Sequence, residues 1–374
     1  MRCLLIGPYT ESPGATGEDT FVRSLISNPP AGIEYVHYSQ LLADNKASRQ
    51  PWVHALFSRL DALGYLSPAP WLETFTCDED FDLVHVHGFD VRLAGAVARK
   101  PVILSTSSYG PENCRSYWGW EEDRIARYHR RVRCLFRRLH IYDACNNTMN
   151  AARTIVWSEY ARALHLAGGA DPKYLSVIPP GVEVPHALAD KPLDETRVLF
   201  VGQDFRRKGG DILLRAWSQI PAPRARLIVI GGESVALPAG ARHFQYVSPA
   251  ELKNDFYTKS HILALPSRAE GYGLAALEAM AHGLVVVASN TGALPEIVVH
   301  GETGCLVPVG GVGELARRLR ELIYQPNLCR AMGAAGYRRA QERFGEDLRN
   351  RLLLDLYEET IGQCIPALEE CAAA

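Results

Sequence analysis

The sequence lacks the features that mark membrane-spanning, secreted and disordered proteins. Its longest apolar runs, such as residues 284–288, have the length of a strand, whereas a membrane-spanning helix needs roughly 20 apolar residues. The apolar segment at Cys3 is shorter than the roughly 7–15 residues of a signal-peptide core, so we expect a buried first strand there. With 47% apolar and 22% charged residues, the composition is that of a soluble globular chain and excludes disordered or collagen-like structure.

Paired cysteines and an excess of one charge are absent as well. The nine cysteines are odd in number and form no C-x-x-C pair, which argues against a disulfide framework and against a thiolate zinc site. A reducing cytosol is the simplest location for such thiols, so we expect a cytoplasmic protein. The 40 basic and 42 acidic residues leave a net charge of −2, so no nucleic-acid partner is expected.

What the sequence does contain is an alternation of short apolar runs with amphipathic segments of helix length. This alternation predicts parallel sheets covered by helices, and 374 residues suit two domains. Prolines interrupt the pattern near residues 179–195, so we predict two doubly wound α/β domains joined near residues 182–195, with a ligand cleft between them. The expected strands are 3–7, 33–37, 83–87, 102–105, 155–158, 176–178, 197–201, 227–230, 262–265 and 285–288, and the expected helices include 20–26, 121–140, 211–219, 274–282 and 312–324.

The most informative segment is a glycine-bearing turn between a strand and a helix, residues 266–280, PSRAEGYGLAALEAM. Glycines in the turn let the backbone approach a ligand closely, and the amides at the start of a helix favour an anion. Glu270 and Glu278 are groups that only accept hydrogen bonds, which suits them to sugar hydroxyls. Either glutamate alone is readily explained as a surface charge, but the combination predicts a diphosphate at the helix start and a ribose beside a carboxylate.

This segment resembles the E-x7-E signature of retaining GT-B glycosyltransferases, and specifically of glycosyltransferase family 4. Residues 289–308, SNTGALPEIVVHGETGCLVP, are similar to the family's following stretch, and residues 158–182 are similar to the end of its N-terminal domain. The resemblance implies the GT-B fold, two Rossmann-like domains facing across a cleft with a C-terminal helix that crosses back to the first domain. It also implies an acceptor-binding domain over residues 1–190, with about 347–374, and a nucleotide-sugar-binding domain over residues 191–346.

Three consecutive cations, Arg206, Arg207 and Lys208, follow the strand expected at residues 197–201. Fixed cations at the carboxyl end of a buried strand can neutralise a departing diphosphate without a metal ion. In the family, a Gly-Arg pair followed five positions later by Lys-Gly contacts the diphosphate, and here Gln203 stands in place of that arginine. We therefore expect Arg207 and Lys208 to bind the diphosphate and Arg206 to face solvent. A basic surface loop is the alternative interpretation.

The N-terminal half carries weaker signals. The loop before the helix at residues 20–26 contains Gly14 and Gly17, and the resemblance implies that one of them, Gly17 by preference, contacts the phosphate of the nucleotide sugar. Ser107 stands at the position of a family histidine that contacts the transferred sugar, and we expect Ser107 and Tyr109 to bind the acceptor. A hydroxyl can hydrogen-bond a sugar, but it cannot carry the positive charge of a histidine.

Two histidines, His85 and His87, alternate along the strand expected at residues 83–87. Side chains two residues apart lie on one face of a strand, which would suit a metal ion. No third ligand is evident in the sequence, so we expect hydrogen-bonded histidines of the cleft or of the core and no metal site.

Taken together, the resemblance implies a retaining hexosyl- or N-acetylhexosaminyltransferase that needs no cofactor. A front-face mechanism follows from it, in which the acceptor hydroxyl attacks from the side of the leaving group and a β-phosphate oxygen accepts its proton. A UDP-sugar is favoured over a GDP-sugar, and the acceptor is a glycan, a glycolipid or a small molecule. The residues implied are Arg207 and Lys208 for the diphosphate, Glu270 for the sugar, Gly271, Tyr272, Gly273 and Leu274 for phosphate or sugar hydroxyls, and Glu278 for ribose.

Two alternatives fit the same architecture. A sugar-nucleotide 2-epimerase would consume the nucleotide sugar without an acceptor, and a non-catalytic subunit would bind it without turnover. The absent histidine and the Gln203 replacement keep the second of these open as an alternative. A nicotinamide oxidoreductase is disfavoured, since no G-x-G-x-x-G follows a strand.

A basic amphipathic segment lies at residues 124–140, with seven arginines and no acidic residue. Such a pattern is typical of a helix that lies on an anionic membrane surface. It is equally typical of a helix that packs by its apolar face and leaves its arginines in solvent. Peripheral membrane contact through residues 124–140, on the inner face of the membrane, is therefore one of two interpretations.

Overall fold

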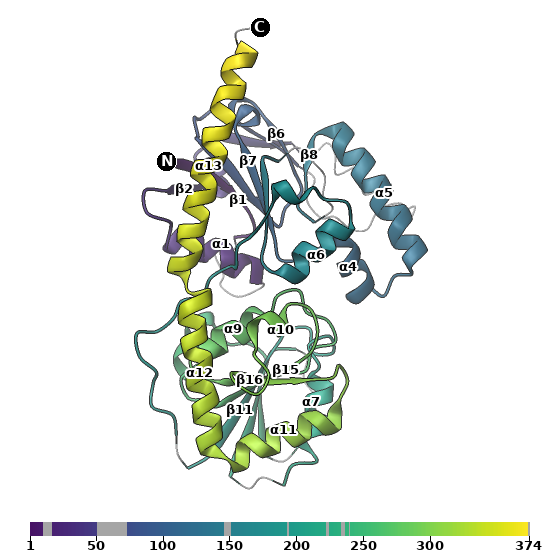
Figure 1. The fold of residues 1–374 in the computed structure, drawn as a ribbon, viewed down its shortest axis with the longest axis vertical. Coiled ribbons are helices and arrows are strands. Elements are labelled where there is room, and N and C mark those ends of the chain that lie inside the picture. The colour runs from purple at the N-terminus through teal and green to yellow at the C-terminus, as the bar shows by residue number, and fades with distance from the viewer. Residues whose placement is uncertain are drawn as a thin grey trace. The chain divides into compact units, whose positions relative to one another are not determined.

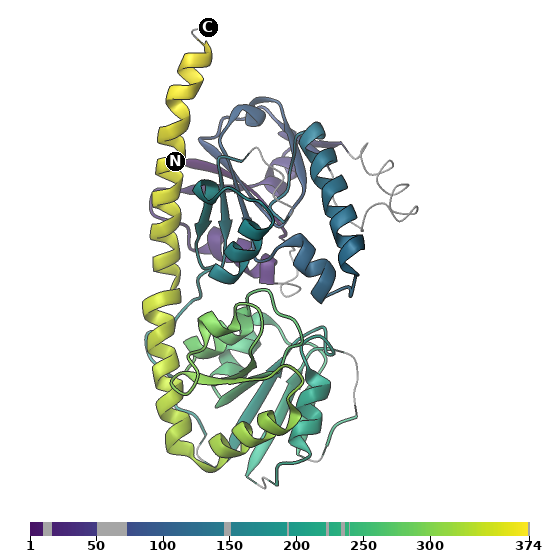
Figure 2. The ribbon, with the colours of Figure 1, turned by 45° about the vertical axis from the view of Figure 1, so that its right-hand side comes forward.

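The computed structural model describes residues 1–9, 17–50, 73–145, 151–192, 194–221, 224–232, 236–238 and 240–372. The chain divides into two compact units, of which unit 1 is Met1–Pro179 with Arg349–Ala374 and unit 2 is Pro180–Leu348. Each unit is built on a six-stranded sheet with helices against it (Figures 1 and 2). The predicted α/β class with two Rossmann-like domains is confirmed.

The sheet of unit 2 is entirely parallel and has the order β13-β12-β11-β14-β15-β16. Along the chain β11 comes first, β12 and β13 follow on one side of it, and β14, β15 and β16 follow on its other side. The strand order therefore reverses between β11 and β14. Ligands in open α/β sheets bind at the carboxyl ends of the strands where the order reverses. The strands are β11 (Thr196–Val201), β12 (Ala225–Ile230), β13 (Ala241–Phe244), β14 (Ile262–Leu265), β15 (Val285–Ser289) and β16 (Gly304–Val307).

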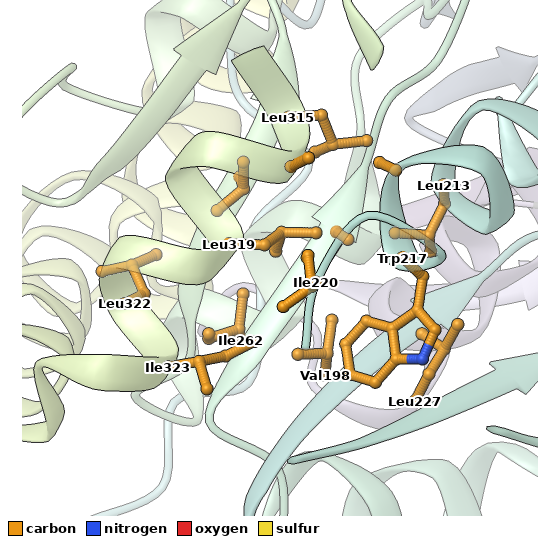
Figure 3. Close-up of a cluster of buried hydrophobic side chains, with 14 of the residues drawn as sticks. Val198, Leu213, Trp217, Ile220, Leu227, Ile262, Leu315, Leu319, Leu322 and Ile323 are labelled. Carbon is orange, nitrogen blue, oxygen red and sulfur yellow. The ribbon is translucent and has the colours of Figure 1, made fainter. Parts of the chain in front are cut away.

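Alternate residues of these strands bury one face of the sheet under two helices, α7 and α11 (Figure 3). Trp217 and Leu213 of α7 and Leu319 of α11 pack there against Val198 and Ile262. Each such side chain contributes about 1.5–3 kcal/mol when it is fully buried. The helices of unit 2 are α7 (Gly210–Trp217), α8 (Pro249–Glu251), the π-helix η3 (Leu252–Tyr257), α9 (Leu274–Ala281), α10 (Leu294–Ile297), α11 (Val312–Tyr324) and α12 (Pro326–Phe344).

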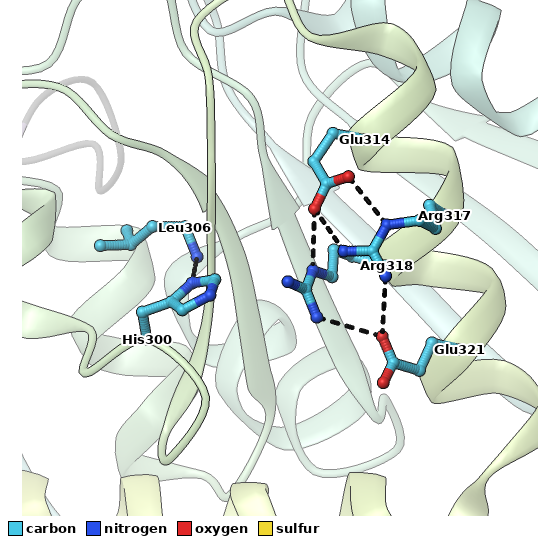
Figure 4. Close-up of polar contacts among 6 residues, drawn as sticks. All are labelled: His300, Leu306, Glu314, Arg317, Arg318 and Glu321. Atoms are coloured by element: carbon cyan, nitrogen blue, oxygen red, sulfur yellow. Dashed lines mark hydrogen bonds and ion pairs between the residues drawn. The ribbon is translucent and has the colours of Figure 1, made fainter.

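The outer face of α11 carries a network of ion pairs (Figure 4). Arg317 and Arg318 lie between Glu314 and Glu321 in the sequence, and each arginine is three or four residues from each glutamate. This spacing places the charged groups side by side on a helix. Hydrogen bonds from these arginines, from Arg317 above all, lower the pKa of Glu314 to about 2. Because the pairs lie at the surface and are partly exposed to solvent, they add little to stability. In β16, the Leu306 amide donates to His300 Nδ1 at 2.9 Å.

Unit 1 has a parallel sheet in the order β10-β9-β7-β5-β1-β2 and a second, four-stranded sheet in the order β3-β4-β6-β8. The second sheet was not expected from the sequence. Its strands have only two to five residues, β3 (ASRQ) is mostly polar, and β3 pairs with a strand far along the chain, Ala47 opposite Cys77. The strands are β1 (Arg2–Ile6), β2 (Glu34–His37), β3 (Ala47–Gln50), β4 (Glu73–Cys77), β5 (Leu83–His87), β6 (Val91–Ala94), β7 (Val102–Thr106), β8 (Ile141–Tyr142), β9 (Arg153–Val156) and β10 (Leu175–Val177).

The last helix of the chain, α13, packs on unit 1. Arg349, which is 1% exposed, donates to the carbonyl of Asn28 at 3.1 Å, and the Tyr357 hydroxyl lies 2.9 Å from that of Tyr35. None of the described helices is both long and apolar enough to cross a membrane. The helices of unit 1 are α1 (Gly17–Ser27), α2 (Tyr38–Ala43), η1 (Ala96–Arg99), α4 (Gly110–Ser116), α5 (Glu122–Leu139), α6 (Glu159–Ala167), η2 (Pro172–Tyr174) and α13 (Glu346–Ala372).

Candidate functional site

The candidate site of unit 2 lies at the carboxyl ends of β11 and β14, where the strand order reverses. The loop after β11 contains Arg206, Arg207 and Lys208, and the loop after β14 contains Glu270. A backbone hydrogen bond ties the two loops together, because the Arg268 amide donates to the Arg207 carbonyl at 2.7 Å. Pairing of two strands that are distant in sequence thus brings the predicted cations and the predicted carboxylate to one place.

Lys208 and Glu270 form the central ion pair of this site. The Lys208 ammonium donates to Glu270 Oε2 at 2.6 Å, and the Ser267 hydroxyl donates to the same oxygen at 3.2 Å. The two side chains are only 16% and 7% exposed, so the pair is poorly screened by water. The ammonium group is therefore held in a fixed position beside the glycine-bearing turn.

Arg207 is held against the same turn by different contacts. Its Nη1 donates to the Ala269 carbonyl at 3.1 Å, and its Nε donates to Asp204 Oδ2 at 3.1 Å. Arg206 and Gln203 are exposed. Of the three consecutive cations, Arg207 and Lys208 are the two that contact the turn at residues 269–270 with their side chains.

Two glycines allow the loops to approach closely. Gly209 has a φ of +79° and Gly292 a φ of +58°, both in the left-handed region that favours glycine. A Cβ atom on Gly209 would lie 1.9 Å from the Pro266 carbonyl oxygen, and one on Gly292 would lie 1.8 Å from that of Glu270. The loop after β15, which carries Gly292, is therefore a third wall of the site that sequence reasoning did not single out.

The start of α9 completes this part of the site. Gly273, with a φ of +104°, precedes the helix, whose run of Ala and Leu favours helical structure. The Tyr272 ring is 4% exposed, and burial raises the pKa of its hydroxyl. Its side chain therefore belongs to the core, and we expect only the backbone amides of Gly271, Tyr272, Gly273 and Leu274 to face an anionic ligand.

Glu278 is held by a tyrosine that sequence reasoning missed. The Tyr257 hydroxyl donates to Glu278 Oε2 at 3.0 Å, and the Tyr257 side chain is fully buried. Burial raises the pKa of Glu278, and the hydrogen bond from Tyr257 opposes this rise. Tyr257 is the last residue of a π-helix. This conformation is rare in proteins overall, but where it occurs it is often at a functional site. Nothing in the local sequence distinguishes it from an ordinary core tyrosine.

The predicted residues of unit 1 lie at the start of α1 and after β7. Gly17 is the exposed first residue of α1, and Gly14 lies outside the described residues. The Ser107 hydroxyl donates to Glu18 Oε1 at 3.4 Å, and burial raises the pKa of Glu18. The Tyr109 ring is 6% exposed and lies 4.8 Å from the His165 ring, which favours a packing role for that side chain.

His85 and His87 are fully buried, so of the two expected placements, cleft and core, both histidines have the second. His85 Nε2 and His87 Nδ1 both lie 2.7 Å from the Ser105 hydroxyl, and the His87 ring stacks on Trp157 at 5.2 Å. Burial lowers the pKa of each histidine to about 3, so both rings are neutral. Within the described ranges, no three His, Cys, Asp or Glu side chains are grouped so as to hold a metal ion.

Comparison with known proteins finds similarity to glycosyltransferases over the part of the chain that contains this site. Residues 186–339 match the model of the family described as glycosyl transferases group 1. The D-inositol 3-phosphate glycosyltransferase of Rhodococcus opacus is 33% identical over 215 residues, which are 50% of this chain and 48% of that protein. The protein of the same name from Mycobacterium tuberculosis H37Ra is 32% identical over 247 residues, 58% of this chain and 48% of that protein. The chain thus spans about half the length of the curated relatives it matches.

Solved structures are similar over nearly the whole chain. Sucrose-phosphate synthase from Thermosynechococcus elongatus has a TM-score of 0.69 at 19% identity, with 97% of this chain and 99% of that chain covered. Anabaena HepE in complex with UDP-glucose has a TM-score of 0.66 at 16% identity, with coverage of 96% and 100%. The chain therefore has the GT-B fold of these proteins, and its residues 186–339 carry the sequence pattern of group 1 glycosyl transferases.

Proposed function

We propose that the protein is a retaining glycosyltransferase that moves a hexosyl or N-acetylhexosaminyl group from a UDP-sugar to an acceptor hydroxyl, without a metal ion. The observation that carries the proposal is the Lys208–Glu270 pair beside the start of α9, at the strand-order reversal of unit 2. The group 1 family model over residues 186–339 and the fold shared with HepE, whose structure contains UDP-glucose, support it.

The geometry suggests a role for each group. The amides at the start of α9 hold the diphosphate, and Lys208 and Arg207 stabilise the charge that develops on it as the bond to the sugar breaks. Glu270 accepts hydrogen bonds from the sugar hydroxyls, and Glu278 accepts them from ribose. The acceptor oxygen forms the new bond on the face that UDP leaves, and its proton passes to a β-phosphate oxygen. The products are the glycoside and UDP.

The test is to measure binding and turnover separately. Thermal-shift measurements with UDP-glucose, UDP-N-acetylglucosamine and GDP-mannose identify the nucleotide sugar, and an acceptor panel with that compound then shows transfer. We expect the UDP-sugars to raise Tm most, and NMR of the product to show the anomeric configuration of the substrate. An inverted product would contradict the retaining mechanism. A 2-epimerase would convert the nucleotide sugar without an acceptor, and a non-catalytic subunit would bind UDP without turnover.

Replacing Tyr257 with phenylalanine is expected to weaken UDP binding about 3- to 10-fold, because Glu278 loses the hydrogen bond that orients it. Affinity for 2′,3′-dideoxy-UDP should not change, since that analogue has no ribose hydroxyls for Glu278 to bind. Tyr337→Phe is the matched control, because it also removes a hydroxyl that donates within unit 2, to the Pro185 carbonyl at 2.6 Å. Equal loss for both nucleotides would show that Tyr257 acts on the fold and not on the ribose contact.

We also propose that α5 contacts an anionic membrane surface. Its apolar residues Ile125, Val132 and Phe136 are buried within unit 1, so they do not insert into lipid. Trp118, just before the helix, is 52% exposed, which suits a residue at a membrane interface. Six arginines of the helix are exposed to attract anionic headgroups: Arg124, Arg127, Arg130, Arg131, Arg137 and Arg138.

Vesicle co-sedimentation tests this contact. At low salt we expect binding to vesicles that contain phosphatidylglycerol and none to vesicles of phosphatidylcholine alone. The double variant Arg130→Glu with Arg137→Glu should abolish the binding, because each basic residue near the membrane surface contributes about 1 kcal/mol to the free energy of membrane binding. Arg224→Glu with Arg338→Glu, at exposed positions of unit 2, is the control with the same change in charge. If the protein stays in the supernatant with anionic vesicles, the proposed membrane contact is wrong, and α5 is a helix whose arginines are only solvated.

A further inference from the structure

The Arg268 guanidinium group joins the loop after β14 to the loop after β11 and to the start of α7. Its Nη1 donates to Asp211 Oδ1 at 2.6 Å, and its Nη2 donates to Asp211 Oδ2 at 2.7 Å. Nη1 also donates to the carbonyl of Arg206. Two parallel hydrogen bonds from a guanidinium to a carboxylate fix the orientation of the pair as well as its distance. Arg268 is therefore attached to the chain on both sides of Lys208, at positions 206 and 211.

The arginine next to Lys208 makes the reverse contact. The Arg207 side chain, from the loop after β11, donates to the Ala269 carbonyl at 3.1 Å. The Arg268 side chain, from the loop after β14, donates to the Arg206 carbonyl, and its amide donates to the Arg207 carbonyl at 2.7 Å. Each loop is thus held by an arginine side chain of the other. Arg207 and Ala269 each directly precede one member of the central ion pair of the site.

The pair of Arg268 and Asp211 adds little to stability by itself. Its side chains are 38% and 40% exposed, and ion pairs at such positions contribute little to the free energy of unfolding. Hydrogen bonds from Arg268 lower the pKa of Asp211, so the carboxylate stays ionised at neutral pH. What the pair does fix is the path of the chain from residue 206 to residue 211, the segment that contains Lys208.

Lys208 needs this support because its own ion pair does not fix its place. The ammonium group is bound to Glu270 Oε2 at 2.6 Å, and both residues lie on loops. An ion pair between two loops keeps the distance between its charges, but it does not keep the ammonium group in place relative to the start of α9. Misplacement of a catalytic group by about 1 Å costs about 10²-fold in rate. The contacts of Arg268 hold the loop after β11 to the loop that leads into α9.

We propose that Arg268 and Asp211 are positioning residues, which hold the backbone on either side of Lys208 so that its ammonium group meets the diphosphate of the nucleotide sugar. This role rests on the transferase activity proposed above. The two side chains act through Lys208 and are not assigned any contact with the substrate. They should therefore affect the rate of sugar transfer more than the binding of the nucleotide sugar.

A double-mutant cycle on the full chain tests this role. We expect Arg268→Ala and Asp211→Ala each to lower kcat for UDP release about 10- to 30-fold, with KM for the UDP-sugar changed less than about threefold. The double variant should lose no more than Arg268→Ala, because the two side chains act as a unit. Arg268→Lys keeps the charge without the two parallel hydrogen bonds, so it should restore little of the rate. Losses that multiply in the double variant, or full activity of Arg268→Lys, would overturn the proposal.

Arg317→Ala is the matched control. Arg317 also binds a carboxylate through two hydrogen bonds, to Glu314 at 2.8 and 2.6 Å, but on the outer face of α11. We expect kcat to be unchanged in this variant, and we expect the urea midpoints of Arg317→Ala and Asp211→Ala to be alike. If Asp211→Ala lowers the midpoint far more than the control does, the pair belongs to the fold and the positioning role is wrong.

The Lys208 ammonium group gives a readout that does not depend on turnover. We expect it to give a 1H–15N NMR signal at low temperature, since it is 16% exposed and held in an ion pair, and Lys208→Arg identifies that signal. The signal should shift or broaden in Asp211→Ala and stay unchanged in Arg317→Ala. A changed signal in a protein that transfers no sugar would refute the proposed function and keep the attachment of Lys208 by this pair. An unchanged signal would overturn the positioning role, and in an active enzyme it would leave the proposed function intact.

Discussion

The Lys208→Ala variant should transfer sugar about 10²- to 10³-fold more slowly than the wild-type protein, measured as kcat for UDP release. The expectation follows from the position of the ammonium group, 2.6 Å from Glu270 Oε2 in a part of the site that is largely shielded from water. Charge on a departing diphosphate develops mainly in the transition state, so a fixed cation lowers the barrier more than it tightens substrate binding. We therefore expect KM for the UDP-sugar to change much less than kcat.

Two further variants separate a role in catalysis from a role in folding. Lys259→Ala removes a lysine of the same unit that pairs with Asp255 on the surface, and it should leave kcat unchanged. Lys208→Ala leaves Glu270 without its cation, so the double variant with Glu270→Gln shows whether an unpaired buried carboxylate contributes to the loss. A folded Lys208→Ala protein with kcat within threefold of wild type would contradict the proposed role.

The Gly292→Ala variant is expected to lose about 2–4 kcal/mol of the free energy of unfolding and most of its transferase activity. Alanine at a φ of +58° is strained, and its Cβ would lie 1.8 Å from the Glu270 carbonyl oxygen, so the turn that carries Glu270 must move. Chemical denaturation measures the stability, and UDP release measures the activity.

Gly301→Ala is the control for backbone strain alone. Gly301 has a φ of +82°, and a Cβ built there would have no described atom within 4 Å beyond those of its chain neighbours. Alanine should therefore lower the free energy of unfolding by only about 1–2 kcal/mol and leave sugar transfer unchanged. Equal loss of stability and activity in both variants would mean that the contact between Gly292 and Glu270 is unimportant.

Elements with a strong local pattern could be predicted from the sequence. The strands at residues 83–87 and 262–265 and the helix at residues 312–324 have the predicted bounds. Both strands are fully buried: residues 262–265 are a continuous apolar run, and residues 83–87 are apolar except for the two buried histidines. The helix α11 has apolar residues at helical spacing. The second sheet of unit 1 was missed, because its pairing joins short polar strands such as β3 and β4 that are far apart in the chain.

The candidate site could be predicted only as a set of residue types. The glycine-bearing turn, the carboxylates and the basic loop are visible in the sequence, since each lies within a few positions of a strand end. The partners of these groups were not visible. Tyr257 beside Glu278 and Gly292 beside Glu270 come from other elements, and only packing brings them into contact.

Local sequence patterns are enough to set the class of fold and the chemical groups available, because apolar periodicity, turn glycines and a charged loop act over a few residues each. The tertiary structure decided which groups meet. Strand order places the loops after β11 and β14 side by side. Strand order is set by burial of apolar faces between distant segments, and no local pattern contains that information.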